Sequence, residues 1–347
     1  MYRMSKKNTG ILSPAQRRET NQVKFSEFDV TQIHDDVHLT NFALAIWNKA
    51  DSFIANRIFP NLPVSIPTGE IMNFGVQGMS IVDTKKGTYS ELNKVRFKVK
   101  ESDRFLLEDH GLWDDVFAAE YKRFGNGKLK DKLDEIKTKN ILQLMLLAKE
   151  YQCLRSFSSD VISNYTVLAS PAKWNNTGSD PIADIRNLIT SVEDECGQKP
   201  NALVIAPDVI NKLCDNAQIR ARITGIVTSV GEGTVLDILK KEFSINEILV
   251  PRAKTYDEDS SEFEKLFFNK VAALVIDDTP SGWEKNTFGY TFTDEGTFKT
   301  YKLTGLAGQP QGFLNGQETM IKIVDSRDIK ILNEKCAGVL DGVLATS

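Results

Sequence analysis

Apolar residues recur at three- and four-residue steps in two long segments, and this spacing predicts two helices. The first segment runs from Asp36 to Ile58, and the second from about residue 129 to residue 155. The second contains no Gly or Pro, and its first half is rich in Lys, Asp and Glu. At 1.5 Å per residue it would form a helix roughly 40 Å long. A helix of that length can act as the spine of a domain.

The segment between these helices has a different pattern. From Ser65 to Lys100 it combines several glycines with short apolar runs, and it ends in Val95, Phe97 and Val99 alternating with basic residues. This pattern predicts a long β-hairpin with a polar tip at residues 83–87. The segment has few large side chains with which to form its own core, so we expect the hairpin to lie on a neighbouring surface.

Between residues 170 and 278 helical and strand patterns alternate. Asp180 and Pro181 are typical of a helix start, and Gly197 of its end. The apolar run Ala202–Ala206 predicts a buried strand, followed by a helix from Pro207. A second unit pairs a helix at residues 234–243, capped by Thr234, with a strand at 248–250. The alternation predicts a compact α/β domain.

The rest of the chain is rich in strand patterns. Strands are predicted at residues 265–268, 272–276, 288–292, 297–303, 319–324, 328–332 and 338–340. Residues 256–264 carry five acidic side chains and are interpreted as a hydrated surface loop. The whole pattern indicates the α+β class.

The 347 residues, 41% of them hydrophobic, can bury more than one core, so two domains are expected. No run approaches the roughly 18 apolar residues needed to cross a bilayer, and the first ten residues do not form a secretion signal. The four cysteines are widely spaced, without a CxxC pair, and are predicted to be reduced core residues. Neither a membrane nor a cofactor is expected.

Charge is unevenly distributed along the chain. The net charge is −4, yet a single acid, Glu19, accompanies six basic residues near the amino terminus: Arg3, Lys6, Lys7, Arg17, Arg18 and Lys24. Residues 1–30 are too polar to bury themselves and are interpreted as an arm. The arm could contact nucleic acid or an acidic surface, but a solvated, flexible terminus is the simpler interpretation.

Candidate catalytic residues are few. His34 and His38 are four residues apart, as in zinc-binding helices, but Asp35 replaces the usual glutamate and no third ligand follows at a suitable distance. A polar helix start is the favoured interpretation. Lys85 and Lys86 could form an isopeptide bond with an asparagine, although ordinary solvated lysines are favoured. The sequence therefore predicts no catalytic or metal site.

The order of these segments resembles that of the major capsid proteins of tailed bacteriophages, which share a fold with herpesvirus capsid floors and cellular encapsulins. Local similarity is strongest from Asp184 to Leu213, with further likeness at Phe59-Pro60 and Ala337–Leu340. The resemblance implies an N-arm and following helix at 1–60, an E-loop at 61–100, a P-domain with the spine helix at 101–165 and 278–330, and an A-domain at 166–277 and 331–347.

The resemblance also implies a function. The protein would assemble into pentamers and hexamers that form an icosahedral shell around double-stranded DNA, with each E-loop across the next subunit's spine helix. A separate scaffolding protein, a portal and a decoration protein would be partners, and the shell would assemble in the bacterial cytoplasm and become part of the virion. Assembly surfaces are expected at the basic arm and at the E-loop tip, which comprises Asp83, Lys85, Lys86 and Gly87.

Two alternatives remain open. An encapsulin would use the same fold to build a cellular compartment. A metal-dependent hydrolase using His34 and His38 is the alternative from another class.

Overall fold

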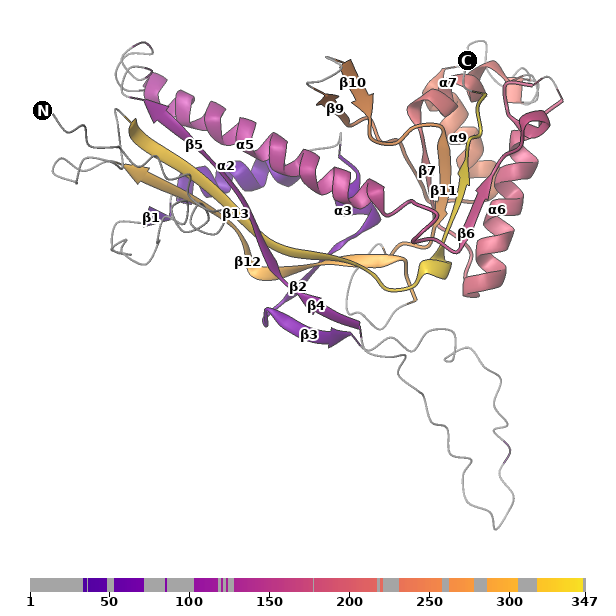
Figure 1. The fold of residues 1–347 in the computed structure, drawn as a ribbon, viewed down its shortest axis with the longest axis horizontal. Coiled ribbons are helices and arrows are strands. Elements are labelled where there is room, and N and C mark those ends of the chain that lie inside the picture. The colour runs from indigo at the N-terminus through magenta and orange to yellow at the C-terminus, as the bar shows by residue number, and fades with distance from the viewer. Residues whose placement is uncertain are drawn as a thin grey trace, which may run out of the picture.

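A computed structural model describes residues 34–35, 37–48, 53–71, 85, 103–117, 120, 123, 128–176, 178–216, 219–220, 231–257, 262–277, 286–304 and 317–345. The helices and strands are arranged around two sheets, which lie at opposite ends of an elongated molecule (Figure 1). The long strands β12 and β13 run from one end towards the other.

The long sheet has the strand order β1-β12-β13-β5, with β2 also paired to β12. These strands are β1 (His34–Asp35), β12 (Gly289–Thr304), β13 (Gln317–Ile331), β5 (Glu108–Phe117) and β2 (Asn61–Val64). Only β2 runs parallel to its neighbour. The sequence predicted two short strands in place of each of β12 and β13, and this was wrong. The acidic turn signal at residues 294–296 belongs to a bulge, because the register shifts between Thr293 and Phe298.

The predicted spine helix is confirmed as α5 (Lys128–Arg155). It packs on β5 and β13, beside α2 (Val37–Asn48). The buried residues of this layer come from all these elements: Ala43, Val116, Leu133, Ile141, Leu142, Met145, Leu146, Ile321 and Ile323. The helical segment predicted from residue 36 to residue 58 is instead divided into α2 and the short α3 (Ala55–Ile58).

The compact sheet has the order β6-β14-β11-β7-β8. Its strands are β6 (Asn164–Val167), β14 (Ala337–Asp341), β11 (Lys270–Leu274), β7 (Ala202–Ile205) and β8 (Glu247–Leu249). Three helices accompany it: α6 (Pro181–Cys196), α7 (Pro207–Asp215) and α9 (Glu232–Phe243). Two short 3-10 helices, η4 (Ser170–Ala172) and η5 (Glu334–Cys336), lie in its connections.

Helix α6 has the predicted boundaries. The Asp180 carboxylate accepts a hydrogen bond from the Ala183 amide at 3.1 Å, and Pro181 occupies the first turn. Gly197 has a φ of 74°, a left-handed conformation that suits glycine at the end of a helix. The side chains predicted to form its apolar face are buried: Ile182, Ile185, Leu188, Ile189 and Val192.

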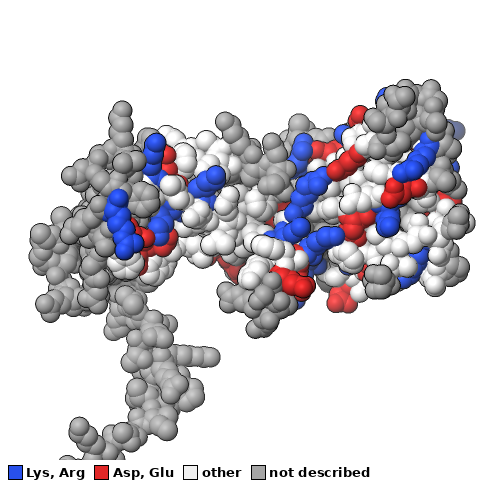
Figure 2. Space-filling view, turned by 90° about the horizontal axis from the view of Figure 1, so that it is seen from above, with Lys and Arg blue, Asp and Glu red and all other residues white. Residues whose placement is uncertain are grey.

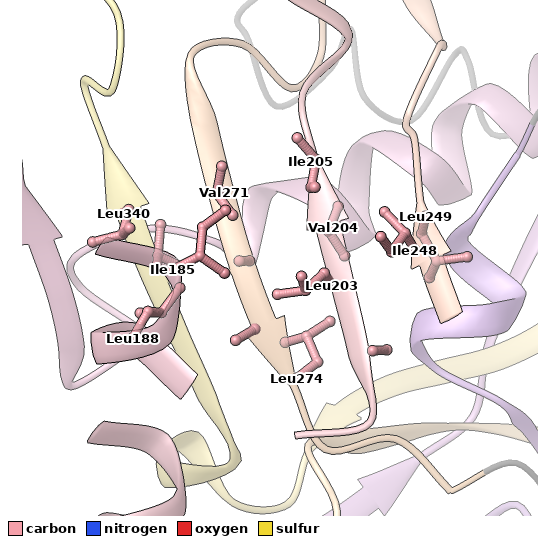
Figure 3. Packing of buried hydrophobic residues seen from close by; sticks show 14 of the residues in the cluster. Ile185, Leu188, Leu203, Val204, Ile205, Ile248, Leu249, Val271, Leu274 and Leu340 are labelled. Carbon is pink, nitrogen blue, oxygen red and sulfur yellow. The ribbon is translucent and has the colours of Figure 1, made fainter. Parts of the chain in front are cut away.

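The compact sheet holds the largest core. Every residue of β7 is buried, as expected for a central strand with both faces covered. Figure 3 shows Ile185 and Leu188 of α6 beside Val271 and Leu340, with Ile248 and Leu249 of β8 on the other side of β7. This core gives the compact end of the molecule its own basis for stability.

Two further strand pairs are separate from the sheets. β3 (Thr68–Ile71) pairs with β4 (Asp103–Leu106), and β9 (Lys254–Asp257) pairs with β10 (Glu262–Lys265). The interpretation of residues 256–264 as a surface loop was therefore wrong where these residues belong to β9 and β10. The strand predicted at 265–268 overlaps β10 only at Lys265. Charged residues lie on both faces of this hairpin, so no apolar alternation identified it.

Candidate assembly surfaces

Glu150 connects the spine helix to α3. Its Oε2 accepts hydrogen bonds from the backbone amides of Ile54, at 3.0 Å, and Ala55, at 2.8 Å, so a side chain from α5 satisfies the amino terminus of α3. Burial raises the pKa of Glu150, and the two amide hydrogen bonds oppose that rise. The interaction fixes the chain just before β2 against the end of the spine helix.

Lys149 is buried beside this carboxylate. Its Nζ donates hydrogen bonds to the side-chain oxygens of Asn56, at 2.5 Å, and Asn61, at 3.1 Å. Burial lowers the pKa of Lys149 to about 8, because desolvation disfavours the charged ammonium. Lys149 and Glu150 therefore form a buried polar junction between α5, α3 and β2.

A buried ion pair lies within β13. Arg327 Nη1 and Asp325 Oδ2 are 2.6 Å apart, and both side chains are almost fully buried. Alternation along the strand places them on the same face as Ile321 and Ile323, which pack against α5. His110 is opposite Asp325 on β5, and burial together with the Arg327 charge lowers the pKa of this histidine. The face of β13 towards α5 is therefore apolar at Ile321 and Ile323 and charged at Asp325 and Arg327.

The pair β3–β4, called here the base, brackets the predicted E-loop, with β3 inside residues 61–100 and β4 just after them. Its buried side chains, Ile71 and Phe105, pack with Phe292 of β12. The rings of Phe105 and Phe292 are stacked with centroids 4.6 Å apart. Gly69 lies against this stack, since a Cβ at that position would be 2.6 Å from the Phe105 ring. The base is therefore anchored on its own subunit.

The outer side of this base is partly apolar. Ile66 and Leu106 are each 56% exposed. The Leu106 amide donates a hydrogen bond to Asp328 Oδ2 at 2.9 Å, which holds β4 against β13 while leaving the Leu106 side chain in solvent. Figure 1 shows the pair on the opposite side of the long sheet from α5.

The spine helix presents apolar residues to solvent. Ile136, Leu144 and Tyr151 are 51%, 59% and 53% exposed. They recur at steps of eight and seven residues, so they form one stripe along the helix. Lys132, Lys139 and Arg155 are also exposed, and none of the acidic residues described on α5 is fully exposed. The stripe of Ile136, Leu144 and Tyr151 is called here the spine stripe.

The strand β5 exposes apolar side chains on both faces. It pairs only with β13, so its other edge has no described strand partner. Leu112, Trp113 and Phe117 are exposed along it. Exposed apolar groups of this kind indicate an interaction surface. The sequence did not predict this strand, because Glu108, Asp109 and Gly111 obscure any apolar alternation.

The predicted site residues fall mainly outside the described residues. Lys85 is exposed, whereas the other predicted tip residues and all six basic arm residues lie outside the described part of the chain: Asp83, Lys86, Gly87, Arg3, Lys6, Lys7, Arg17, Arg18 and Lys24. Their assembly roles remain predictions.

The zinc-helix hypothesis is contradicted. His34 lies on β1, and α2 begins only at Val37, so His34 and His38 are not four apart on one helix. Among the described residues no cluster of potential metal ligands occurs. The predicted cap at Thr234 was also wrong, since Gly231 precedes the first turn of α9 and Thr234 lies within the helix.

All four cysteines lie in the described part of the chain and are free thiols, as predicted. Cys153, Cys196 and Cys336 are buried, and Cys214 is half-buried. Within the described ranges, no helix is long and apolar enough to span a membrane.

Comparison with solved structures gives several matches over most of the chain. A phage-related protein from Bordetella bronchiseptica is 19% identical, with 90% of this chain and 98% of that chain covered and a TM-score of 0.71. The capsid protein of cyanophage P-SCSP1u is 11% identical, with coverage of 84% and 87% and a TM-score of 0.54. A virus-like particle from Pyrococcus furiosus is 16% identical, with coverage of 88% and 98% and a TM-score of 0.52.

No family model matches the sequence, and no curated protein does. The likeness therefore lies in the arrangement of the elements and not in the sequence. The protein is a mixed helix-and-strand chain of the α+β class, which confirms the predicted class. Its fold is that of the phage major capsid proteins.

Proposed function

We propose that this chain is a structural, shell-forming protein, the major capsid protein of a tailed bacteriophage. The observation that carries the proposal is the structural match over 90% of the chain to a phage-related protein, together with the match to a cyanophage capsid. Fold alone does not assign function, so the surfaces of the protomer supply the second argument.

The protomer exposes apolar groups where a neighbour would cover them. Three separate elements each carry an apolar side chain that is more than half exposed. These are Trp113 on β5 (58%), Leu144 on α5 (59%) and Leu106 on β4 (56%). An enzyme that acts alone has no need of such surfaces, whereas a subunit that contacts several copies of itself does. Many weak contacts repeated by symmetry would stabilise a shell.

The E-loop at residues 61–100 would complete these contacts. Its described base, β3–β4, is fixed on the protomer by Ile71 and Phe105. The rest of the loop would lie on the next subunit of the ring. In this proposal α5, β5, β12 and most of β13 belong to the P-domain at 101–165 and 278–330, and most of the compact sheet belongs to the A-domain at 166–277 and 331–347.

The remaining assignments follow from this role. The protein would form pentamers and hexamers, with a separate scaffolding protein, a portal and a decoration protein as partners. Its basic arm, residues 1–30, would contact the packaged double-stranded DNA through nonspecific phosphate attraction. The shell would assemble in the host cytoplasm and remain in the virion without catalysing a reaction.

Sedimentation velocity with electron microscopy of the purified full chain tests the proposal. We expect rings of five or six subunits or closed shells, alone or when the scaffolding protein is co-expressed. A monomer that persists at high concentration with scaffold present would contradict it.

The encapsulin alternative uses the same fold, so the fold does not distinguish it from a phage shell. Purified particles distinguish the two, because a phage shell would be recovered from infected cells with DNA and an encapsulin with a protein cargo.

A further inference from the structure

The interior of the compact end holds two cysteines from distant parts of the chain. Cys196 is the last residue of α6, and Cys336 is the last residue of η5, just before β14. They are 140 positions apart (336 minus 196), and both are fully buried. Figure 2 shows acidic and basic side chains mixed over the face of the compact end that it presents. The two thiols lie beneath the surface of this end, away from bulk solvent.

The helix α6 approaches β14 closely at Gly338. A Cβ at this position would be 2.6 Å from Cγ2 of Val192 and 2.9 Å from Cδ1 of Leu188. Cys196 lies one helical turn after Val192, on the same side of α6. Cys336 lies two residues before Gly338. The close packing of the helix on the strand therefore brings the two cysteines to the same place.

The side chain of Asn286 binds both cysteines. Its Nδ2 donates a hydrogen bond to the backbone oxygen of Cys196 at 2.9 Å, and its Oδ1 accepts one from the Cys336 thiol at 3.3 Å. A single amide group thus spans the distance between the two residues. Asn333 Nδ2 donates a further hydrogen bond to Asn286 Oδ1 at 2.7 Å, which fixes the orientation of that amide.

The two thiols also interact with each other. A hydrogen bond from the Cys336 thiol lowers the pKa of Cys196, and the same contact raises the pKa of Cys336. Cys196 is therefore the thiol that ionises first, and the thiolate is the form that attacks an oxidant. Because the two sulfur atoms are already in contact, a bond between them requires little movement of the backbone.

We infer that Cys196 and Cys336 form an oxidisable pair, whose disulfide ties the end of α6 to the start of β14. A hydroperoxide is the class of oxidant that suits this pair, since hydrogen peroxide is small and Cys196 lies at a helix end, where local opening is easiest. In the reduced protein both residues stay in the core as free thiols.

The reaction has two steps. The Cys196 thiolate attacks one oxygen of hydrogen peroxide, the O–O bond breaks, and a sulfenic acid forms as hydroxide leaves. The Cys336 sulfur then attacks the sulfenic sulfur, and its proton leaves with the sulfenic hydroxyl group as water. The hydroxide takes up the proton that Cys196 released on ionisation. Two thiols are thus oxidised to one disulfide, and one peroxide is reduced to two waters.

The disulfide would depend on the surroundings of the protein. A reducing cell interior keeps thiols reduced, whereas a disulfide persists in oxidising surroundings. The bond would close a loop of more than one hundred residues, which lowers the entropy of the unfolded chain and stabilises the folded one. This inference goes beyond the proposed shell function and does not depend on it.

Peroxide treatment of the folded full chain tests the pair. The number of thiols that react with a chromogenic reagent after unfolding should fall from four to two. Mass spectrometry of a non-reduced digest should find the peptide of Cys196 joined to the peptide of Cys336, and dithiothreitol should separate them. Cys214 is the most accessible of the four thiols. Oxidation of Cys214 while Cys196 and Cys336 stay reduced would overturn the inference.

Serine variants show whether both members of the pair are needed. Cys336→Ser should abolish the joined peptides, because no second thiol then reaches the Cys196 sulfenic acid. Cys153→Ser is the matched control, since Cys153 is equally buried, in α5, and this variant should keep the joined peptides. If Cys336→Ser does not fold, the digest of the unmodified chain still decides the question.

Thermal unfolding measures the consequence for stability. The oxidised chain should unfold at a temperature roughly 5 °C higher than the reduced chain, and dithiothreitol should reverse the rise. Equal unfolding temperatures would overturn the tie between α6 and β14. Thiol counts and digests can be obtained from the chain in any assembly state. A chain that forms no shell would therefore refute the proposed function and leave this inference standing.

Discussion

The ring of Phe105, on β4, lies nearly parallel to the ring of Phe292, on β12, with 4.6 Å between centroids and 5° between planes. This stack joins two residues 187 positions apart (292 minus 105) and fixes the base of the E-loop on the long sheet. The stack therefore anchors β4 on the long sheet, at the place from which we propose that the E-loop extends to a neighbour.

Replacing Phe105 by Ala should therefore lower the free energy of unfolding by about 3 to 5 kcal/mol, the usual cost of truncating a buried aromatic side chain. Urea unfolding of the isolated protein, followed by fluorescence, measures the change. Leu106→Ala is the matched control because its side chain is 56% exposed, and we expect a change within about 0.5 kcal/mol. Equal losses for the two variants would contradict the anchoring role of Phe105.

Glu150→Ala should destabilise the protein by about 2 to 4 kcal/mol, since it leaves the buried amides of Ile54 and Ala55 without an acceptor. Glu150→Gln keeps an oxygen for both amides and should lose less than half as much. Thermal and urea unfolding compare the two variants. A Gln variant as unstable as the Ala variant would show that the carboxylate charge, and not the cap of α3, is what matters.

Lys149 should make stability depend on pH in the alkaline range. Its pKa in the folded protein is about 8, lower than its ordinary value, so between that pH and about 10.5 the unfolded chain holds a proton that the folded chain has released. The free energy of unfolding therefore rises with pH across this window, and Lys149 contributes about 3 kcal/mol to that rise. Below about pH 8 the contribution of Lys149 does not change with pH.

Unfolding the parent and Lys149→Met across pH 7 to 10.5 isolates that contribution, because other lysines and tyrosines titrate in both proteins. The parent should gain stability relative to the variant as pH rises. A constant difference between the two proteins would mean that Lys149 keeps its ordinary pKa, in conflict with its burial.

Arg327→Leu should cost about 3 to 5 kcal/mol, because it leaves the buried Asp325 carboxylate without its partner. Replacing both residues by Leu should recover most of this loss, since two apolar side chains would continue the α5-facing row of Ile321 and Ile323. A double-mutant cycle by urea unfolding measures the coupling. Additive losses would show that the two side chains do not act as a pair.

The helices α5 and α6 were predictable because their apolar residues follow the helical period, and β7 because it is a short continuous apolar run. α5, α6 and β7 each have a buried face that the sequence identifies without knowledge of the fold. Long β12 and β13 were predicted as fragments, since Asp294 and Gly296 are typical of a turn and Asp325 and Arg327 of an exposed segment. In the sheet, the first pair lies in a bulge and the second is buried as an ion pair.

The candidate surfaces were less predictable. The strand β5 has a single fully buried residue, Val116, and β10 has none, so neither alternation nor apolar content distinguishes these strands from loops. The aromatic contact of Tyr256 with Phe263 depends on the strand register, which the sequence alone does not specify. Conversely, His34 and His38 have a suggestive spacing, but the boundary between β1 and α2 falls between them.

Cryo-electron microscopy of the assembled protein, at a resolution that traces the chain, tests the central claim most directly. It asks where residues 72–100 lie relative to the base formed by β3 and β4. We predict that this segment extends over an adjoining subunit in a ring of five or six. A segment folded into the interior of its own subunit around a ligand-filled cleft would contradict it.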